Sequence, residues 1–386
     1  MKARELGIEI GFGTPGPLNA ITDVAGVKVG HTTIIEGDGP LIVGKGPIRT
    51  GVTIIKPHDG VIAEEPLYAG CHSLNGNGEV TGLLWLKQSG LLTSHIGITN
   101  SHSVGTVRDT LAVIDTEERQ PGHLYWSLPV VGETWDGQLS DINGFHVKPE
   151  HVRQAYASAG GGPVAEGNVG GGTGMVCYMF KGGIGTSSRV LPEEAGGYTV
   201  GVLVQANFGS RGEYQVNGAP VGQHINEQVI PVPFPPEYEK NPASGAFAVP
   251  SGGGSIVGIA ATDAPLIPHQ CDSLAQRIGL GVARTGNSGD HWSGDIFLAF
   301  STANRLPGSG MTWPAPLTSN VKVLSTNYMD PLYDAVIEAT MEAILNAQLA
   351  AETMVGRDGV TAHALDPEIL VGVLRQCDRL RFAVQA

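Results

Sequence analysis

Charged residues, long apolar runs and closely spaced cysteines are all scarce in this chain of 386 residues. Asp, Glu, Lys and Arg together make up 16% of the sequence, below the usual quarter. No apolar run approaches the length that a membrane-spanning helix needs. The N-terminal MKARELGIEI lacks the apolar core of a signal peptide. The composition therefore predicts a cytoplasmic protein with a large core and no membrane partner.

The four cysteines form no Cys-x-x-Cys pair, and the twelve histidines form no His-Glu-x-x-His or His-x-His pattern. In a chain of this size, such isolated cysteines are expected to be reduced and buried. Zinc sites need paired ligands at short spacing, which this sequence does not offer. We therefore predict no metal and no cofactor.

Basic residues are outnumbered, with 23 Lys and Arg against 37 Asp and Glu, which gives a formal net charge of −14. An acidic surface repels the phosphate backbone of nucleic acids. Nucleic acid is therefore excluded as the expected partner.

Glycine, by contrast, is abundant, with 56 residues and no collagen-like period. The densest stretch is GGPVAEGNVGGGTGMVCYMFKGGIGTSSR, residues 161–189. A dinucleotide-binding glycine motif follows a strand and opens a helix, and this stretch shows neither feature clearly. We expect tight turns that let backbone approach backbone. A glycine-rich nucleotide-binding protein remains the rival interpretation.

Periodicity predicts strands and helices that alternate but also cluster, which indicates stacked layers of sheet and helix. The predicted strands are 24–34, 50–56, 198–209, 255–262 and 296–304. The predicted helices are 78–91, 103–115, 150–159, 268–283 with Gly279 as its end, 333–355, and a last helix opened by Asp366 and Pro367. The polar, Pro- and Gly-rich segment 210–254 is predicted to be an exposed linker.

The stretch FAVPSGGGSIVGIAATDAPL, residues 247–266, places three glycines directly before Ser255 and a strand. A loop meeting a strand is one interpretation. The other is that the chain is cut before Ser255. A serine at a chain start carries its own α-amine, whose usual pKa of about 7.7–8.0 suits a general base. Glycine at 254 would leave the carbonyl open to attack by the Ser255 hydroxyl.

Several long motifs resemble the L-aminopeptidase/D-amidase-esterase family, which includes the β-aminopeptidases. They are GTPGPLNAITDVAGVKVGHTT (13–33), RTGVTII (49–55), GGPVAEGNVGGGTGM (161–175), KGGIGTSSR (181–189), GVLVQAN (201–207), ATDAPL (261–266) and SGDIFLAFSTAN (293–304). The resemblance implies an α+β, αββα four-layer fold of N-terminal-nucleophile type. It also implies a single catalytic domain cleaved before Ser255 into fragments 1–254 and 255–386, and a homotetramer of the processed heterodimers.

Further roles follow from the resemblance, residue by residue. A helper serine and an acid fall on Ser293 and Asp295, where family members often have Glu at the second position. The same tripeptide occurs upstream at 288–290, but IFLAFST directly follows the second copy. Asn207 falls on the oxyanion-stabilising amide, and Glu133 on the carboxylate that holds the substrate's amino group.

Simpler interpretations stand beside these roles. Asn207 also suits a strand-end turn, Glu133 and Asp136 a solvated acidic loop, and Ser293 with Asp295 a turn before a strand. Trp135 suits either the wall of a substrate pocket or an ordinary aromatic position.

The resemblance implies a serine aminopeptidase, amidase or esterase that acts on small peptides, amides or esters through an acyl-enzyme on Ser255. An L-α, D-α or β first residue would each be compatible with this chemistry. The alternative within the same chemistry is an acyltransferase, as in the ornithine acetyltransferases of related architecture. Those enzymes use threonine at the position where this chain has Ser255.

Overall fold

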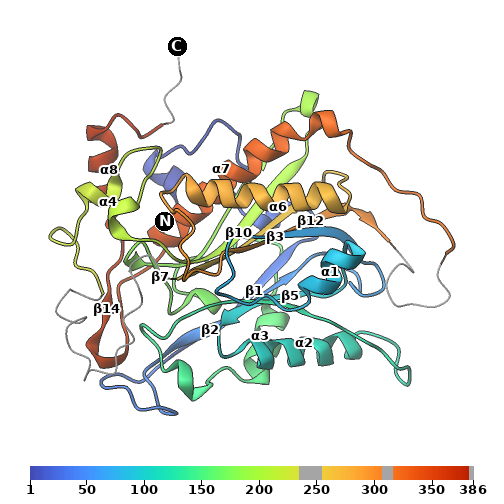
Figure 1. Ribbon diagram of the computed structural model, residues 1–386, viewed down its shortest axis with the longest axis horizontal. Helices are drawn as coiled ribbons and strands as arrows, with labels where there is room; N and C mark the ends of the chain where they lie inside the picture. The colour runs from blue at the N-terminus through green and yellow to red at the C-terminus, as the bar shows by residue number, and fades with distance from the viewer. Residues whose placement is uncertain (234–253, 307–315, 382–386) are drawn as a thin grey trace.

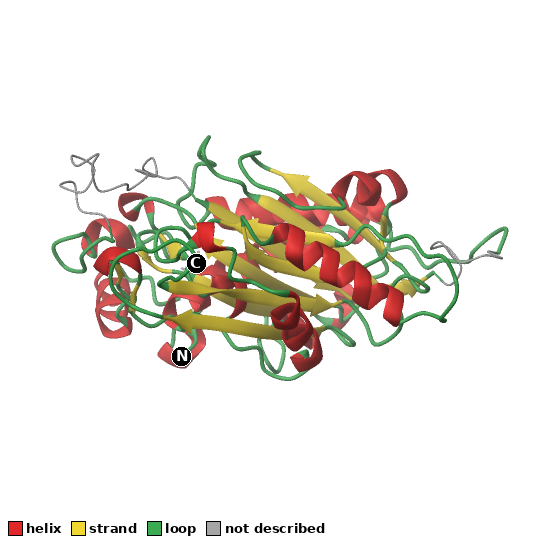
Figure 2. Ribbon diagram, turned by 90° about the horizontal axis from the view of Figure 1, so that it is seen from below, coloured by secondary structure: helices red, strands yellow, loops and turns green. Residues whose placement is uncertain are grey.

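The computed structural model describes residues 1–233, 254–306 and 316–381. Two sheets face each other, and helices cover the outer face of each sheet (Figure 1). The view turned by 90° shows the strands enclosed between helices on both sides (Figure 2). The expected αββα order of layers is therefore present in this chain.

The larger sheet has six strands in the order β4-β3-β12-β11-β10-β9, and only the β11–β12 pair is parallel. The strands are β3 (Leu67–Ser73), β4 (Leu91–Leu92), β9 (Gly183–Val190), β10 (Thr199–Asn207), β11 (Ser255–Thr262) and β12 (Ile296–Arg305). β10 and β11 are buried along their whole length, as their continuous apolar character predicts. Both strands lie in the interior of the sheet, each hydrogen-bonded to a neighbour on both sides.

The smaller sheet has the strand order β1-β2-β5-β6. The strands are β1 (Lys28–Glu36), β2 (Ile48–Lys56), β5 (Ile96–Asn100) and β6 (Val130–Thr134). Apolar side chains from the two sheets meet in one cluster that includes Ile98, Val130, Leu203 and Val257. β6 therefore faces β11, which brings the ends of these two strands toward the same region.

Helices α6 (Pro268–Ala283) and α7 (Asp330–Leu349) cover the larger sheet, and α2 (Val104–Glu117) and α3 (Pro149–Ser158) cover the smaller one (Figure 1). The remaining elements are α1 (Leu83–Ser89), α4 (Val221–His224), α8 (Pro367–Gln376) and the short strands β7 (Val176–Cys177), β8 (Phe180–Lys181), β13 (Met354–Val355) and β14 (Thr361–Ala362). None of the helices formed by the described residues combines the length and apolarity that crossing a membrane requires.

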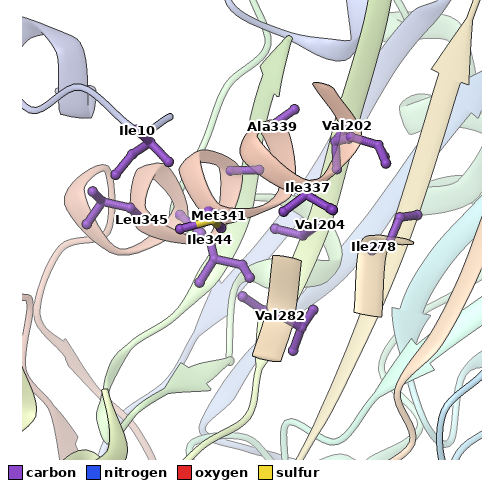
Figure 3. Packing of buried hydrophobic residues seen from close by; sticks show 14 of the residues in the cluster. Ile10, Val202, Val204, Ile278, Val282, Ile337, Ala339, Met341, Ile344 and Leu345 are labelled. Carbon is purple, nitrogen blue, oxygen red and sulfur yellow. The ribbon is translucent and has the colours of Figure 1, made fainter. Parts of the chain in front are cut away.

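The predicted helix 333–355 corresponds to α7, which begins at Asp330 and ends at Leu349. Beyond its end, the Asn168 side chain bonds both backbone groups of Glu352. Its apolar residues pack against β10 and α6, as Ile337 and Ile344 do in Figure 3. The helix is therefore buried on nearly all sides.

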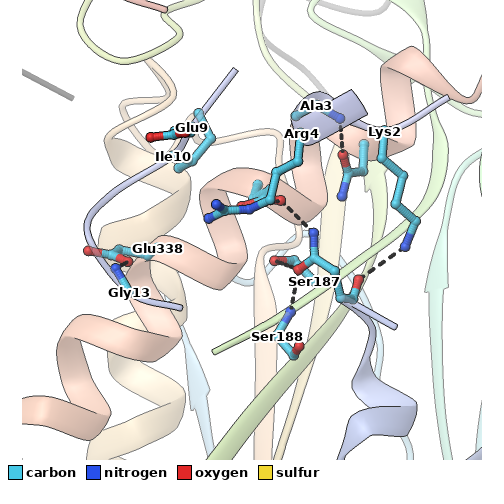
Figure 4. A network of polar contacts seen from close by, with 12 residues as sticks. Lys2, Ala3, Arg4, Glu9, Ile10, Gly13, Ser187, Ser188 and Glu338 are labelled. Atoms are coloured by element: carbon cyan, nitrogen blue, oxygen red, sulfur yellow. Dashed lines mark hydrogen bonds and ion pairs between the residues drawn. The ribbon is translucent and has the colours of Figure 1, made fainter. Parts of the chain in front are cut away.

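The polar residues in the second half of α7 are also buried, and the N-terminal segment and β9 supply partners for several of them. Ala3 N donates to Asn346 Oδ1 at 2.9 Å, and Gly13 N donates to Glu338 Oε2 at 2.8 Å (Figure 4). The Arg189 guanidinium, 1% exposed, donates to Glu342 Oε2 at 2.8 Å. The N-terminus is thereby bound to the outer helix layer.

Gly279 does not end α6, which continues to Ala283. The glycines in this helix serve packing instead. A Cβ on Gly281 would lie 2.6 Å from Thr340 Cβ and 2.8 Å from Ile337 O, so only glycine lets α7 approach this closely. This close packing explains why glycine stands inside α6, although glycine within a helix lowers its stability.

The glycine-rich stretch forms a buried 3-10 turn over Gly170–Gly172. A Cβ on Gly171 would lie 2.1 Å from Gln205 Oε1, and one on Gly172 would lie 2.4 Å from Ile184 N. Close approach of backbone is therefore what these glycines provide, as predicted. The turn opens no α-helix, so the nucleotide-binding arrangement is not formed here.

The prediction of an exposed linker is wrong for residues 210–233. Tyr214, Val221 and Ile225 belong to the main core cluster. The Arg211 side chain holds this segment by donating to the carbonyls of Tyr178 at 3.0 Å and of Ile225 at 3.0 Å. The remainder of the predicted linker, residues 234–253, lies outside the described residues.

Two smaller expectations can be compared directly with the structure. Asp366 Oδ1 accepts hydrogen bonds from Glu368 N at 2.9 Å and Ile369 N at 3.1 Å, which confirms the cap of α8. The cysteines are free, and Cys71, Cys177 and Cys271 are buried, whereas Cys377 is only half-buried.

Candidate active site

Ser255 is the first residue of β11 and lies opposite Asn207, the last residue of β10. Because the strands are antiparallel, the start of one meets the end of the other. Ser255 is 5% exposed and lines a pocket of about 710 Å³. The hydroxyl is therefore positioned at the edge of a rigid central sheet, next to an open cavity.

One backbone N–H lies close to both groups that would react in self-cleavage. Gly294 N is 3.1 Å from Ser255 Oγ and 3.3 Å from the carbonyl oxygen of Gly254. Gly294 is glycine because a Cβ there would lie 2.5 Å from Gly78 Cα. The donor is held where negative charge on the Gly254 carbonyl oxygen would be stabilised.

Gly254 has φ of +150°, a region that side chains disfavour. A Cβ on this residue would lie 2.1 Å from Asn207 O and 3.0 Å from Phe208 Cα. Glycine is therefore required before Ser255 both by conformation and by space.

Ser293 and Asp295 are completely buried directly behind Ser255. Ser293 Oγ donates to Asp295 Oδ1 at 2.5 Å, and Ile256 N donates to the same oxygen at 3.3 Å. A hydroxyl has one proton, so the Ser293 oxygen is left as an acceptor on its other side. Burial raises the pKa of Asp295, and the hydrogen bonds from Ser293 and Asn75 oppose that rise.

The upstream tripeptide copy, residues 288–290, supplies backbone contacts to this region. Asp290 O accepts a hydrogen bond from Ser293 N at 3.0 Å, and the Ser288 side chain is exposed. The structure therefore brings the second copy, not the first, next to Ser255, and the shorter Asp295 still reaches Ser293.

Hydrogen bonds fix both the oxygen and the nitrogen of the Asn207 side-chain amide. Its Oδ1 accepts a hydrogen bond from Val176 N at 2.8 Å, and its Nδ2 donates to Trp135 O at 3.0 Å. Nδ2 carries a second hydrogen, and Asn207 lines the pocket beside Ser255. The amide is thus oriented so that a donor remains for a group in the pocket.

Glu133 lies at the end of β6 and is only 6% exposed. Its carboxylate accepts hydrogen bonds from Ser101 Oγ and from Glu79 N, the latter at 2.9 Å. Both donors are neutral, and burial raises the pKa of Glu133. Asp136 is completely buried as well, so the alternative of a solvated acidic loop is wrong.

Burial raises the pKa of Asp136 to about 7, although hydrogen bonds from Thr50 and Asn100 favour its ionised form. Asn100 Nδ2 donates to Asp136 Oδ2 at 3.0 Å. Asp136 does not line the pocket, but the carbonyl of the preceding Trp135 orients Asn207.

The pocket joins Ser255, Asn207 and Glu133, which come from β11, β10 and β6. Trp135 forms part of the pocket wall, one of the two positions considered for it from the sequence. Trp292, to which the sequence assigned no role, forms another part. Cavities of this size accommodate small organic ligands.

Sequence reasoning missed several residues that support the site, namely Asn75, Asn77, Glu79, Ser101 and Trp292. Ser101 alone had a usable signal, because it follows the end of β5, which pairs in parallel with β6 and so ends at the same edge as Glu133. Trp292 directly precedes the predicted Ser293, whereas Asn75, Asn77 and Glu79 lie in a loop far from Ser255 in the sequence, and only the tertiary fold brings them there.

Comparison with known proteins gives a consistent result over nearly the whole chain. The profile of Peptidase family S58 matches residues 19–362. Beta-peptidyl aminopeptidase BapA of Sphingosinicella microcystinivorans is 45% identical over 382 residues, which covers 99% of this chain and 94% of that protein. BapA of Sphingosinicella xenopeptidilytica is 42% identical over 376 residues, which covers 97% of this chain and 91% of that protein.

Two solved structures share the architecture of this chain. The β-aminopeptidase of Burkholderia sp. has a TM-score of 0.88 at 48% identity, covering 97% of this chain and 99% of that one. The L-aminopeptidase D-Ala-esterase/amidase of Ochrobactrum anthropi has a TM-score of 0.87 at 42% identity, covering 98% and 99% respectively. The latter is described as a prototype of the serine aminopeptidases and a variant of the Ntn hydrolase fold. The expected fold type is thereby confirmed.

Proposed function

From the premise that this chain belongs to peptidase family S58 and is an aminopeptidase of Ntn-hydrolase fold, we propose that it is a self-processing serine hydrolase with Ser255 as its nucleophile. One observation carries the proposal. Ser255 opens a buried strand at the pocket, preceded by an obligatory glycine and flanked by the Gly294 N–H and the Asn207 amide.

Processing begins with attack of Ser255 Oγ on the carbonyl carbon of Gly254. The Gly294 N–H stabilises the negative charge on the Gly254 oxygen, and the C–N bond to Ser255 breaks in an N→O acyl shift. Water then hydrolyses the resulting ester. The products are fragments 1–254 and 255–386, which remain parts of one layered domain because β10 and β11 pair along their length.

Turnover uses the amine that processing releases. The α-amine of Ser255 accepts the proton of its own hydroxyl, with Ser293 and Asp295 beside it. Oγ attacks the substrate carbonyl, and the free hydrogen of Asn207 Nδ2 stabilises the oxyanion. The leaving amine takes a proton, and water releases the acyl group from Ser255. No cofactor takes part in these steps.

Glu133 holds the ammonium group of the substrate, because it presents a buried carboxylate with only neutral partners to the pocket. This contact accounts for the removal of residues from a free N-terminus. Two relatives are named β-peptidyl aminopeptidases, which favours a β-amino acid among the three classes of first residue. Small peptides, amides and esters with such a residue are the proposed substrates.

The homotetramer of processed heterodimers and the cytoplasmic location stay predictions from the sequence. An acyltransferase remains the second candidate, since the same acyl-enzyme can pass its acyl group to an amine. The two activities separate in a partition experiment with a β-amino acyl p-nitroanilide and an added amine. Release of mainly free acid supports the hydrolase.

The decisive experiment is a denaturing gel with intact-mass measurement of the purified protein and of Ser255→Ala. We expect masses for 1–254 and 255–386 in the active protein, and a single inactive chain in the variant. Ser288→Ala, which removes an exposed hydroxyl of the upstream tripeptide copy, is the matched control and should mature fully. An active enzyme with Gly254 still bonded to Ser255 contradicts the proposal.

A further inference from the structure

The loop of residues 74–79, between β3 and α1, contacts both ends of the candidate site. Asn77 N donates to Ser293 O at 3.1 Å, and Glu79 N donates to Glu133 Oε1 at 2.9 Å. Asn75 precedes both contacts in chain order, and its side chain reaches Asp295. One short loop therefore connects the nucleophile side of the pocket with its carboxylate side.

The Asn75 amide makes a two-point contact with Asp295. Asn75 Oδ1 accepts a hydrogen bond from Asp295 N at 2.5 Å, and Asn75 Nδ2 donates to Asp295 Oδ2 at 3.1 Å. Nδ2 also donates to Asp290 O at 3.1 Å. Both hydrogens of the amide and its oxygen are thus in use, so this side chain has one orientation that satisfies all its partners.

The two oxygens of Asp295 are held differently. Oδ1 accepts hydrogen bonds from Ser293 Oγ and Ile256 N. Oδ2 accepts from Asn75 Nδ2, and within residues 1–233, 254–306 and 316–381 no second donor reaches it. Without Asn75, the carboxylate would be fixed at one oxygen and would carry an unpaired oxygen in a buried site.

We propose that Asn75 is a positioning residue for Asp295. It orients the carboxylate so that Oδ1 faces Ser293, and it favours the ionised form that accepts the hydrogen bond from the Ser293 hydroxyl. The inference rests on the proposed function, because it assumes that Ser293 and Asp295 assist Ser255. Asn75 itself contacts neither Ser255 nor the pocket in the described structure.

The consequence of removing this donor follows from electrostatics. The pKa of Asp295 is already raised by burial, and the nearby Asp290 carboxylate acts in the same direction. The Ser293 hydroxyl, the Asn75 amide and the Ile256 N–H oppose this rise. Loss of the Asn75 donor therefore favours protonation of Asp295, and a neutral Asp295 is a weaker acceptor for the Ser293 hydroxyl.

The test compares the pH profiles of kcat/KM for N75D and the wild type on a β-amino acyl p-nitroanilide. N75D keeps an oxygen where Asn75 Oδ1 accepts from Asp295 N, but places a second oxygen where Nδ2 donates. We expect the acidic limb to move up by about one pH unit or more, with activity recovering at alkaline pH. Asn75→Ala should move it in the same direction by less, since it adds no charge.

Asn226→Ala is the matched control, because the exposed Asn226 side chain accepts a hydrogen bond from Gln228 N at 3.0 Å and does not line the pocket. Its acidic limb should stay at the wild-type position. A uniform loss of activity at every pH in processed N75D, with the limb unmoved, overturns the inference. If N75D does not mature, the same criterion applies to Asn75→Ala. Failure of the proposed function is distinct, since it would appear as an active, uncleaved wild-type chain.

Discussion

Asn207 and Ser255 form the last register pair of the β10–β11 ladder. The pairing places an amide donor and a hydroxyl side by side at the point where β10 ends and β11 begins. A slip of one residue would turn each side chain to the opposite face of the sheet. The continuous burial of both strands makes this register strongly specified, so the fold itself fixes the geometry of the site.

Asn207→Asp tests the role of the amide. Asp keeps an oxygen that accepts from Val176 N but loses the donor that faces the pocket. We expect kcat per processed molecule to fall about 10²- to 10³-fold with little change in KM, as for loss of one oxyanion donor. Steady-state kinetics, normalised to the cleaved fraction on a gel, provide the measurement. A kcat near the wild-type value would exclude Asn207 from this role.

Glu133→Gln tests recognition of the substrate's amino group. Gln keeps one acceptor oxygen for Glu79 N and places an NH₂ group where the second oxygen accepts from Ser101, whose hydroxyl can turn to accept instead, and the negative charge is removed. A charged hydrogen bond contributes about 1.5–3 kcal/mol, so KM for a substrate with a free amino group should rise roughly 10- to 100-fold. The comparison is kcat/KM for this substrate and for an analogue without the amino group. The wild type should prefer the first strongly, and an unchanged preference in the variant would count against the assignment.

Asp136 should make stability depend on pH. Its pKa is about 7 in the folded chain and close to 3.8 when unfolded, so the folded state holds its proton more tightly. Stability therefore falls as pH rises from about 4 to about 7, by on the order of 4 kcal/mol from this group. Asp136→Asn, which does not titrate, should flatten this slope.

Urea unfolding of the uncleaved Ser255→Ala chain, with and without Asp136→Asn, measures the effect at pH 5 and pH 8. We expect the unfolding free energy of the chain that retains Asp136 to fall between these pH values by more than that of the chain carrying Asp136→Asn. Equal changes in both chains would show that Asp136 does not titrate in this range.

Local sequence signals predicted the elements whose cause is local. The alternation and length of apolar runs gave β10 and β11, and the Asp366-Pro367 pair gave the start of α8. The positions of Ser255, Ser293 and Asn207 followed from family motifs, and the structure brings all three together.

Features that depend on tertiary contact could not be predicted in the same way. Gly279 is typical of a helix end, yet α6 continues to Ala283, and α7 packs closely against Gly281 beyond it. Residues 210–233 are polar and loop-like, yet Arg211 binds four carbonyls and fixes them to the core. Asn75 lies 220 positions before Asp295, and no spacing rule connects the two residues.

Gly254→Ala tests whether the geometry before Ser255 controls self-cleavage. A Cβ at this position would lie 2.1 Å from Asn207 O, and φ is +150°, so the alanine chain must shift its backbone. That shift moves the Gly254 carbonyl relative to both Ser255 Oγ and Gly294 N, which lie close to it in the native geometry. Regaining the native geometry at such a position costs about 1–3 kcal/mol, which corresponds to a cleavage rate roughly 5- to 150-fold slower.

The measurement is the fraction of cleaved chain on a denaturing gel over time after synthesis. Gly105→Ala in α2 is the matched control, because no atom lies within 4 Å of its added Cβ, and it should mature at the wild-type rate. Rapid maturation of Gly254→Ala would mean that the carbonyl can reach Ser255 without the geometry seen here. Slow maturation followed by normal turnover would show that glycine at this position is needed for self-cleavage alone, because residue 254 is no longer bonded to Ser255 once the chain is cut.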